Sequence, residues 1–548
     1  MKKLFAIIIA LHASLFAFHL SAQVVNGVIV SDSNNVTVVK LWGTSQERGF
    51  AYGYLMGDEI AIGAEQWIIP WYGNDYELAR ALIEEGTKIK IDSVYREEAK
   101  AVIEGMDAAG FNSAGYDYLD ILAGTIWQDV GSNWPFSKKK DRMNCSAFMN
   151  WNDATAGTDL NGCSVISHHL DWWFIPESCF NRGSIIVHIP SEEGQQPWLM
   201  VDFAGYIAPG SCCNASGYCI ATDGLNVTGG PDTSLSYTPY RFMIRKVLET
   251  SDYNQDGEYN MLDIREAISD QENGYISGSI FSILGPSTAI HDSLIALIAE
   301  VAPEEPFITF RTNSYEDMMP GDNLYAANNP IARNNLHYYC PHYLAMVDTI
   351  GDGTNISSEA NWEMMRVHSN GGNGNLVFMQ FIPEWNQLKL SFCQKINDTI
   401  YPAYLGEPSV FDLEELFTIP VSIKEEMNYD YQLILSPNPA AEEVVVAISG
   451  QQSAACPEGE ARRISSRQHV LRAKPEGSPV GSWQLAVGQN VELTIYDLFG
   501  REVRMLMDEV KSPGEYNARM DVSDLPAGVY LVRLKAGGES IVRKLIVK

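Results

Sequence analysis

The stretch that decides the fold lies at residues 144–173, NCSAFMNWNDATAGTDLNGCSVISHHLDWW. Two apolar runs flank a polar middle rich in Asn, Asp, Gly and Thr, a pattern that predicts a strand, a turn and a second strand. Cys145 opens the first strand, and Asp171 stands toward the end of the second. Because both arms have similar lengths, an antiparallel return brings the thiol and the carboxylate close together.

Three interpretations of Cys145 compete at this point. A metal site would need Cys145, Cys163, His168 and His169 to converge, but they lack the close paired spacing of common zinc sites. Adjacent histidines on one strand also point to opposite faces. A buried structural thiol is the simplest alternative, since cysteine often packs as a small hydrophobe. The third interpretation is a nucleophile oriented by Asp171.

The composition indicates an exported protein. Residues 1–22 combine Lys2 and Lys3 with an apolar run and small residues before a cleavage point near Ala22, as a signal peptide does. The net charge of −31 disfavours nucleic acid and anionic lipid as partners. No later stretch has the length and apolarity of a membrane span. Export permits disulfides, but the connectivity of nine cysteines cannot be deduced.

The chain is predicted to contain two folded parts. Residues 23–144 carry a strand and two helical patterns, residues 145–423 alternate strands with a few helices, and the two segments together form one mixed α/β unit. The composition shifts near Lys424, after which alternating apolar residues and turn signals predict a small β-sandwich over 424–548. A polar, basic stretch near 451–484 is predicted to be a surface insertion.

The last part resembles the type A sorting domain of the type IX secretion system. The matching motifs are SPNP at 436–439, YDLFGREV at 496–503, LPAGVYLVRL at 525–534 and the terminal KLIVK. The resemblance implies contact with that secretion machinery and passage across an outer membrane to the cell surface or the medium.

The opening stretch resembles the catalytic chain of N-terminal-nucleophile cysteine hydrolases, the superfamily of choloylglycine hydrolases, acid ceramidase and the C45 autoproteolytic acyltransferases. These chains begin Cys-Thr/Ser and later carry Gly-Arg-Asn-Leu/Met-Asp, often followed by Trp. Cys145 opens this stretch, and Asp171 and Trp172 match the later motif. His168 stands where the family has arginine; with Trp172 it is expected to contact substrate. The resemblance implies an α+β fold of four layers, αββα.

Further motifs follow in the family's order. SCCNASGYCIATDGLN at 211–226 places Asn214 at the oxyanion-hole asparagine, and FRTNSY at 310–315 places Asn313 as a second asparagine of the site. IARNNL at 331–336 offers Arg333 as the late arginine. Two segments before Cys145, at 42–60 and 115–127, are similar to the C45 branch. The resemblance covers about 380 residues of the chain.

The resemblance implies chemistry that needs no cofactor. Because residues precede Cys145, the chain must be cut at Asn144–Cys145 by attack of the thiol on its own preceding carbonyl. The new α-amine, of ordinary pKa about 7.7–8.0, can then take the thiol proton. Asp171 would orient that amine, and Asn214 and Asn313 would stabilise the oxyanion, each donor contributing about 2.7–4 kcal/mol.

A separate pattern predicts a structural calcium ion. SDYNQDGEYNMLDIREAI, at 251–268, places oxygen-bearing side chains at the spacing of an EF-hand-like loop with glycine at its sharp turn. The predicted ligands are Asp252, Asn254, Asp256, Glu258 and Asp263. A solvated acidic turn and a helix N-cap are the alternatives.

The sequence thus favours a secreted hydrolase that cleaves a linear N-acyl amide through a thioester on Cys145, with acyl transfer as the family's variation. A phospholipase B-like or ceramidase-like lipid hydrolase using the same cysteine is one alternative. An inactive, surface-displayed binding protein is another, and His168 in place of arginine is the feature that favours it.

Overall fold

The computed structural model divides the chain into two compact units, Met1–Thr418 and Ile419–Lys548. The predicted signal peptide and the insertion near 451–484 lie outside the described residues. The structure describes residues 25–34, 36–130, 144–172, 179–227, 229–287, 294–368, 372–419, 431–436, 443–450, 489–497, 502–511, 516–523, 525–526, 528–536 and 539–547.

The first unit contains a nine-stranded sheet in the order β1-β2-β5-β6-β7-β8-β9-β10-β11. β2 and β5 pair in parallel and all other neighbours pair antiparallel. The first two strands precede Cys145 in the chain, so this segment is built into the sheet. The strands are β1 Gly27–Ser33, β2 Val36–Gly43, β5 Gly183–Pro190, β6 Trp198–Phe203, β7 Ser211–Asn214, β8 Cys219–Gly224, β9 Ser279–Leu284, β10 Ala296–Val301 and β11 Ile308–Arg311.

A second sheet of six antiparallel strands has the order β12-β3-β4-β13-β14-β17. β13 and β14 form a hairpin across the turn at Pro383–Trp385. A short ribbon, β15 Gln394–Ile396 with β16 Thr399–Tyr401, follows β14. The sheet strands are β3 Asn144–Asn150, β4 Val165–Asp171, β12 Asn323–Ala326, β13 Asn375–Ile382, β14 Gln387–Phe392 and β17 Ser409–Asp412.

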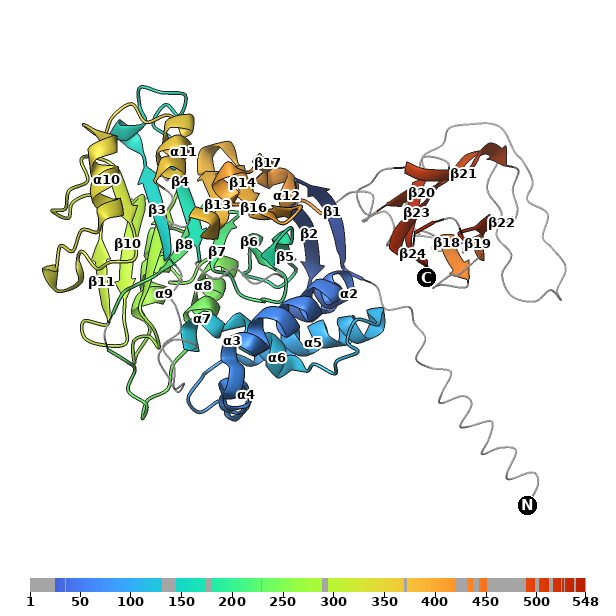
Figure 1. Ribbon diagram of the computed structural model, residues 1–548, viewed down its shortest axis with the longest axis horizontal. Helices are drawn as coiled ribbons and strands as arrows, with labels where there is room; N and C mark the ends of the chain where they lie inside the picture. The colour runs from blue at the N-terminus through green and yellow to red at the C-terminus, as the bar shows by residue number, and fades with distance from the viewer. Residues whose placement is uncertain are drawn as a thin grey trace, which may run out of the picture. The chain divides into compact units, whose positions relative to one another are not determined.

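The two sheets face each other between two layers of helices (Figure 1). β3 and β4 contact β8 of the nine-stranded sheet, α10 and α11 cover the outer face of the six-stranded sheet, and α2 and α8 cover that of the other. The predicted αββα arrangement is confirmed. The helices are α2 Ser45–Gly63, α3 Ile69–Tyr72, α4 Tyr76–Glu85, α5 Ser93–Ala109, α6 Tyr118–Thr125, α7 Trp127–Val130, α8 Tyr240–Glu249, α9 Met261–Ser269, α10 Pro341–Ile350, α11 Ser358–Val367 and α12 Leu413–Leu416.

The helix pair α2–α5 confirms the two predicted helical patterns before Cys145. α2 begins at a capping box made by Thr44 and Glu47. Glycines let the two helices approach closely: a Cβ at Gly105 would lie 2.1 Å from the main-chain oxygen of Phe50. The backbones therefore touch where a side chain would separate them.

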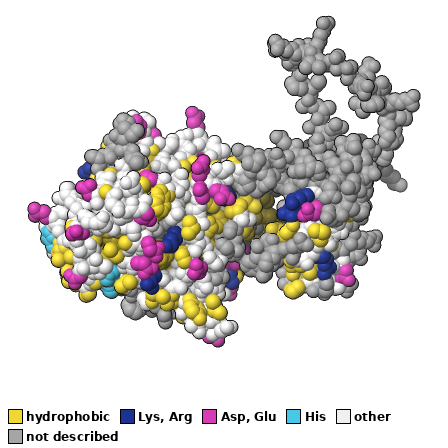
Figure 2. Space-filling view, turned by 90° about the horizontal axis from the view of Figure 1, so that it is seen from above, with side chains coloured by type: hydrophobic (Ala, Val, Ile, Leu, Met, Phe, Trp, Pro, Cys, Tyr) yellow, Lys and Arg dark blue, Asp and Glu magenta, His cyan; other side chains and the backbone are white. Residues whose placement is uncertain are grey.

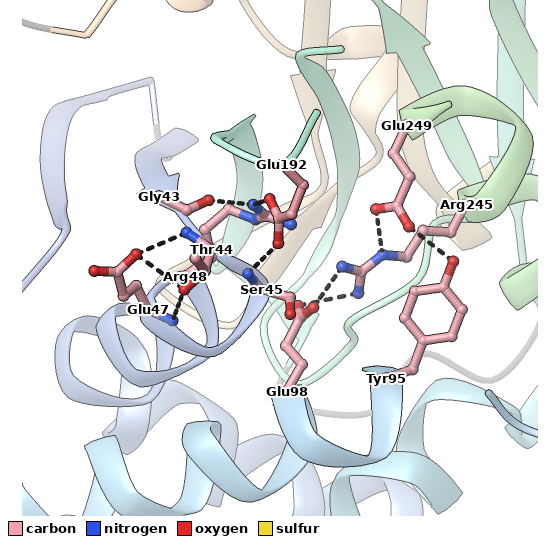
Figure 3. Close-up of polar contacts among 10 residues, drawn as sticks. All are labelled: Gly43, Thr44, Ser45, Glu47, Arg48, Tyr95, Glu98, Glu192, Arg245 and Glu249. Atoms are coloured by element: carbon pink, nitrogen blue, oxygen red, sulfur yellow. Dashed lines mark hydrogen bonds and ion pairs between the residues drawn. The ribbon is translucent and has the colours of Figure 1, made fainter. Parts of the chain in front are cut away.

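Buried ion pairs join the segment before Cys145 to the rest of the first unit (Figure 3). Arg245 on α8 donates to both carboxylate oxygens of Glu98 on α5, at 2.5 and 3.0 Å, and to Glu249 at 3.1 Å. Tyr95 on α5 donates to the other oxygen of Glu249 at 2.8 Å. Because Arg245, Glu98 and Glu249 are all buried, each charge needs its partner.

A second connection starts at the N-terminus of α2. Arg48, fully buried, pairs with Glu192 after β5 at 2.9 Å, and the other oxygen of Glu192 accepts from the Ser45 main-chain N–H at 2.6 Å (Figure 3). The contacts of Arg48 and Arg245 hold α2 and α5 against elements that follow the predicted cleavage point.

The second unit consists of two antiparallel sheets, as predicted for the C-terminal β-sandwich. One has the order β18-β19-β22 and the other β21-β20-β23-β24. The strands are β18 Tyr431–Ser436, β19 Glu443–Gly450, β20 Gln489–Asp497, β21 Glu502–Lys511, β22 Tyr516–Asp521, β23 Gly528–Ala536 and β24 Glu539–Val547.

Acidic side chains lie at several separate places on the face shown in Figure 2 and form no single patch there. None of the helices among the described residues has the length and apolarity needed to cross a membrane.

Replacing Gly105 with alanine is expected to destabilise the first unit. The added methyl overlaps the main chain of α2, so the helices must separate, and we expect a loss of about 1–3 kcal/mol in the free energy of unfolding. Gly124→Ala is the matched control, because a Cβ there lies 3.6 Å from its nearest neighbour, an ordinary contact. Urea unfolding of both variants tests this, and equal midpoints would contradict it.

Candidate functional site

The candidate site is built on the hairpin of β3 and β4. Its register places Asn144 opposite Asp171 and Cys145 opposite Leu170. The predicted antiparallel return is confirmed, and it sets Asp171 opposite Asn144, next to the Asn144–Cys145 peptide bond. Asp171 is fully buried, and its Oδ1 accepts a hydrogen bond of 2.6 Å from Asn375 Nδ2 at the start of β13.

The two adjacent histidines of β4 lie on opposite faces of the sheet, as predicted. His169 faces α11: its Nε2 donates to the main-chain oxygen of Met365 at 2.9 Å, and its ring stacks on Phe378 at 4.2 Å. Burial lowers the pKa of His169 to about 3, so this ring is neutral. His168 faces the nine-stranded sheet, on the same face as Cys145.

His168 forms a buried cluster with Asp223 of β8 and Cys145. Its Nε2 lies 2.9 Å from Asp223 Oδ1, and its Nδ1 lies 3.3 Å from the hydroxyl of Ser211 on β7. One ligand atom from each of Cys145, His168 and Asp223 lies within 4.8 Å of the others. Within the described ranges, this is the one group of three or more His, Cys, Asp or Glu side chains close enough to hold a metal ion. Cys163 and His169 do not belong to it.

The surroundings of Cys145 keep its thiol protonated at neutral pH. Burial raises the pKa of the Cys145 thiol well above its ordinary value, and the charge of Asp223 raises it further. The main-chain N–H groups of Asp171 and Gly224 donate to the sulfur and oppose this shift. The net shift is upward, so thiolate formation requires a proton acceptor.

Asn328 is the residue that holds the nitrogen of Cys145. Its Oδ1 accepts from the Cys145 main-chain N–H at 3.0 Å, and its Nδ2 donates to Gly224 O at 2.6 Å. Its main-chain oxygen accepts from the N–H of Asn226, whose Nδ2 donates to Asn329 at 3.3 Å. Sequence reasoning assigned no role to Asn328, Asn226 or Asp223. For Asp223 and Asn226 a sequence signal was available, because both lie in the motif segment 211–226.

Asn214 lies outside this cluster. Strand alternation turns Ser211 inward and Asn214 outward, where its Nδ2 donates to Leu248 O on α8 at 3.4 Å. Its Oδ1 accepts from the Tyr218 main-chain N–H at 3.0 Å and so closes the β7–β8 turn. The predicted oxyanion role of Asn214 does not agree with this position.

Asn313 lies at the opposite end of β3. It is exposed and donates to Asp322 at 2.7 Å, and the main-chain oxygen of Asp322 accepts from Trp151. Trp151 is six residues along from Cys145, which is about 20 Å in a strand. The predicted role of Asn313 at the oxyanion therefore also disagrees with the structure.

Arg333 binds the loop between β10 and β11. Its guanidinium donates to the main-chain oxygens of Glu304, at 2.6 Å, and Pro306, between β10 and β11. Its main-chain N–H donates to Glu300 at 2.8 Å. These contacts engage the side chain in holding the β10–β11 turn, and the structure shows no contact of Arg333 with Cys145 or Asp171.

Trp172 belongs to a cluster of tryptophans beside the hairpin. Its ring lies 5.5, 5.2 and 5.4 Å from those of Trp67, Trp71 and Trp127, all from the segment before Cys145. A small cavity of about 20 Å³ borders Trp67. Trp172 is 1% exposed, so its ring is enclosed by these neighbours and its predicted contact with substrate stays a prediction.

The predicted calcium loop folds around main-chain N–H groups. Asp252 accepts from Asp256 and Gly257 at 3.1 and 3.0 Å, and Gly257 adopts a φ of +100°, the predicted sharp turn. Asp263 accepts from Tyr253 at 2.7 Å through one oxygen and from Asn260 at 2.7 Å through the other.

Asp263 and Asn260 thus form the capping box that begins α9. The helix-cap alternative accounts for both carboxylate oxygens of Asp263. Asn254, Asp256 and Glu258 likewise form hydrogen bonds with one another inside the loop. Calcium at this loop stays a prediction.

Residues 481–548 match the family model described as "Secretion system C-terminal sorting domain". This domain implies handling by the type IX secretion machinery, and it places the protein outside the outer membrane or at the cell surface. No curated protein matches the chain in sequence.

The first unit is similar to two kinds of solved hydrolase. One is the Caenorhabditis elegans ortholog of N-acylethanolamine-hydrolyzing acid amidase, with 14% identity, 44% of this chain and 93% of that chain covered, and a TM-score of 0.31. The other is a mutant conjugated bile acid hydrolase from Clostridium perfringens, with 10% identity, coverage of 50% and 95%, and a TM-score of 0.29. At these scores the likeness carries no weight in the assignments that follow.

Asp263→Ala is expected to lower the stability of the first unit by about 1–2 kcal/mol even in the presence of a chelator, because it removes a helix cap. Asp256→Ala, which removes a side chain from the exposed part of the loop, is the comparison variant. Thermal melts with chelator and with added calcium separate the two roles. A loss confined to calcium-containing samples would contradict the cap.

Proposed function

We propose that the protein is a secreted amidase that cuts its own chain at Asn144–Cys145 and then hydrolyses a small N-acyl amide through a thioester on Cys145. The observation that carries the proposal is the hydrogen bond from the Cys145 nitrogen to Asn328. A nucleophilic thiol at the start of a strand, with its own nitrogen held by a side-chain oxygen, is what an N-terminal nucleophile requires.

The proposed self-cleavage begins with attack of Cys145 Sγ on the carbonyl carbon of Asn144. The acyl group shifts from nitrogen to sulfur, and water then hydrolyses the thioester and leaves a free α-amine on Cys145. Asn328 Oδ1, which accepts from the amide in the intact chain, can accept from the amine afterwards. The Asp171 carboxyl beside the cut balances the charge of the ammonium form.

In the cut protein, the α-amine takes the thiol proton when Cys145 attacks a substrate amide and returns a proton to the leaving amine. The side-chain amide of Asn226, on the loop next to Asn328, is our candidate donor to the oxyanion in place of Asn214 and Asn313. The tryptophans packed around Trp172, the residue after Asp171, favour an apolar acyl group.

Mass spectrometry of the purified protein is expected to find a fragment that begins at Cys145, and Cys145→Ala is expected to abolish it. Cys163→Ala, in the same hairpin but outside the cluster, should be cut like the wild type. An intact wild-type chain whose Cys145 resists thiol reagents would contradict the proposal. Incubation of the cut protein with N-acyl amino acids, bile-acid conjugates, penicillin V and lysophospholipids then separates amidase from lipid hydrolase.

The two fragments are expected to stay together after the cut, because β1 and β2 remain in the nine-stranded sheet and Arg245 remains paired with Glu98. They should elute as one species in gel filtration. Arg245→Met leaves two buried carboxylates unpaired, at a cost of about 3–5 kcal/mol, so the fragments should separate at lower urea. Arg366→Met, at an exposed pair with Glu363, is the control. Separation of the wild-type fragments without denaturant would contradict the association.

A further inference from the structure

The uncut chain poses a problem of proton transfer that the cut protein does not have. Before cleavage the Cys145 nitrogen is an amide, which donates to Asn328 and has no basicity to take the thiol proton. The thiol is buried and protonated, and it nevertheless has to become a thiolate to attack Asn144. Some other group near the sulfur must accept that proton.

We propose that the His168–Asp223 pair is the proton acceptor that activates Cys145 for cleavage of its own chain. The two side chains come from different sheets, His168 from β4 and Asp223 from β8. One ligand atom of each lies within 4.8 Å of Cys145 Sγ. Both side chains are fully buried and hydrogen-bonded to each other at 2.9 Å. The inference rests on the self-cleavage proposed above.

The position of the Asp223 negative charge supports the role of the pair as proton acceptor. Asp223 as a carboxylate opposes ionisation of the thiol, so a proton that moves from sulfur to the pair removes the charge that held the thiol pKa up. Ser211 fixes the ring by its contact with Nδ1, leaving Nε2 to share a proton with Asp223. His168, which stands where the resembled family has arginine, thereby gains a specific function.

The step balances as follows. The Cys145 S–H proton moves to the His168–Asp223 pair, and the sulfur forms a bond to the Asn144 carbonyl carbon. As the carbon–nitrogen bond breaks, the pair returns the proton to the Cys145 nitrogen, which leaves as an amine. Water hydrolyses the thioester, giving the Asn144 carboxylate and restoring the thiol.

The other ionisable groups near this pair are Cys145, Asp171 at the end of β4, and Tyr325 of β12, whose pKa the charge of Asp223 raises. His169 follows His168 in the chain but lies on the opposite face of the sheet. Burial raises the pKa of Tyr325 well above its ordinary value and lowers that of His169 to about 3, so neither titrates between pH 5 and 9. The pKa of Cys145 is also raised well above its ordinary value, so the profile reports on the group that accepts its proton.

The test measures the rate at which the freshly purified full chain is cut between pH 5 and 9. The wild-type rate is expected to stay nearly constant at the alkaline end of this range, because the pair and not hydroxide accepts the thiol proton. His168→Gln and Asp223→Asn should slow the cut about 100-fold or more at pH 7 and lose the plateau, with the rate climbing about tenfold per pH unit as hydroxide takes over.

His188→Gln is the matched control. His188 is also buried, but it stacks on Trp198 at 4.1 Å on the nine-stranded sheet, away from Cys145, and should be cut at the wild-type rate. Comparing rates at pH 7 and 9 within one folded variant separates a lost proton acceptor from partial misfolding, which lowers both rates alike.

A slowing of less than tenfold, or a plateau retained in both folded variants, overturns the inference and leaves self-cleavage standing. A wild-type chain that is never cut instead overturns the proposed function itself.

Discussion

The pairing of β3 with β4 is the interaction on which the rest of the site depends. This register puts Asp171 beside the Asn144–Cys145 bond and turns Cys145 and His168 toward the other sheet. A slip by one residue would turn both side chains toward α10 and α11 and would remove the thiol from Asp223. The main-chain hydrogen bonds between β3 and β4 therefore determine which side chains face the thiol.

A polar network on the outer face of the same sheet helps to fix that register. Asn361 of α11 donates to Asn150 at 2.6 Å and accepts from Gln380 at 2.9 Å, so one side chain contacts both β3 and β13. Ser167 of β4 donates to the same Asn361. Because every member is buried, a slipped register would leave these groups without partners, which costs more than an apolar mismatch.

The hairpin and the helices before it were predictable because their signals are local, whereas the four layers were expected only from the family resemblance. Alternation, turn residues and helical spacing within about 30 residues suffice for β3, β4, α2 and α5. The partners of Cys145 were not predictable from local signals, because Asn328 lies 183 positions away in the chain and Asp223 is on the other sheet. Asn214 and Asn313 have suitable side chains in suitable motifs, yet strand alternation and the direction of β3 place them elsewhere. Of the motif segments that follow the hairpin, 211–226 supplies Asp223 and Asn226 near the thiol, whereas Asn313 and Arg333 of the later segments lie elsewhere.

The proposed cut lies at a position that the fold can tolerate. Asn144 begins β3 in the six-stranded sheet, whereas the segment before it is anchored in the other sheet by the parallel pairing of β2 with β5. Breaking the Asn144–Cys145 bond therefore separates only the first residue of β3 from the rest of that strand. The buried Arg245–Glu98 and Arg48–Glu192 pairs also lie away from the cut and keep their geometry. The proposed reaction would free the Cys145 amine and change the chemistry of one nitrogen, while the packing that positions Asn328, Asp171 and the thiol would be retained.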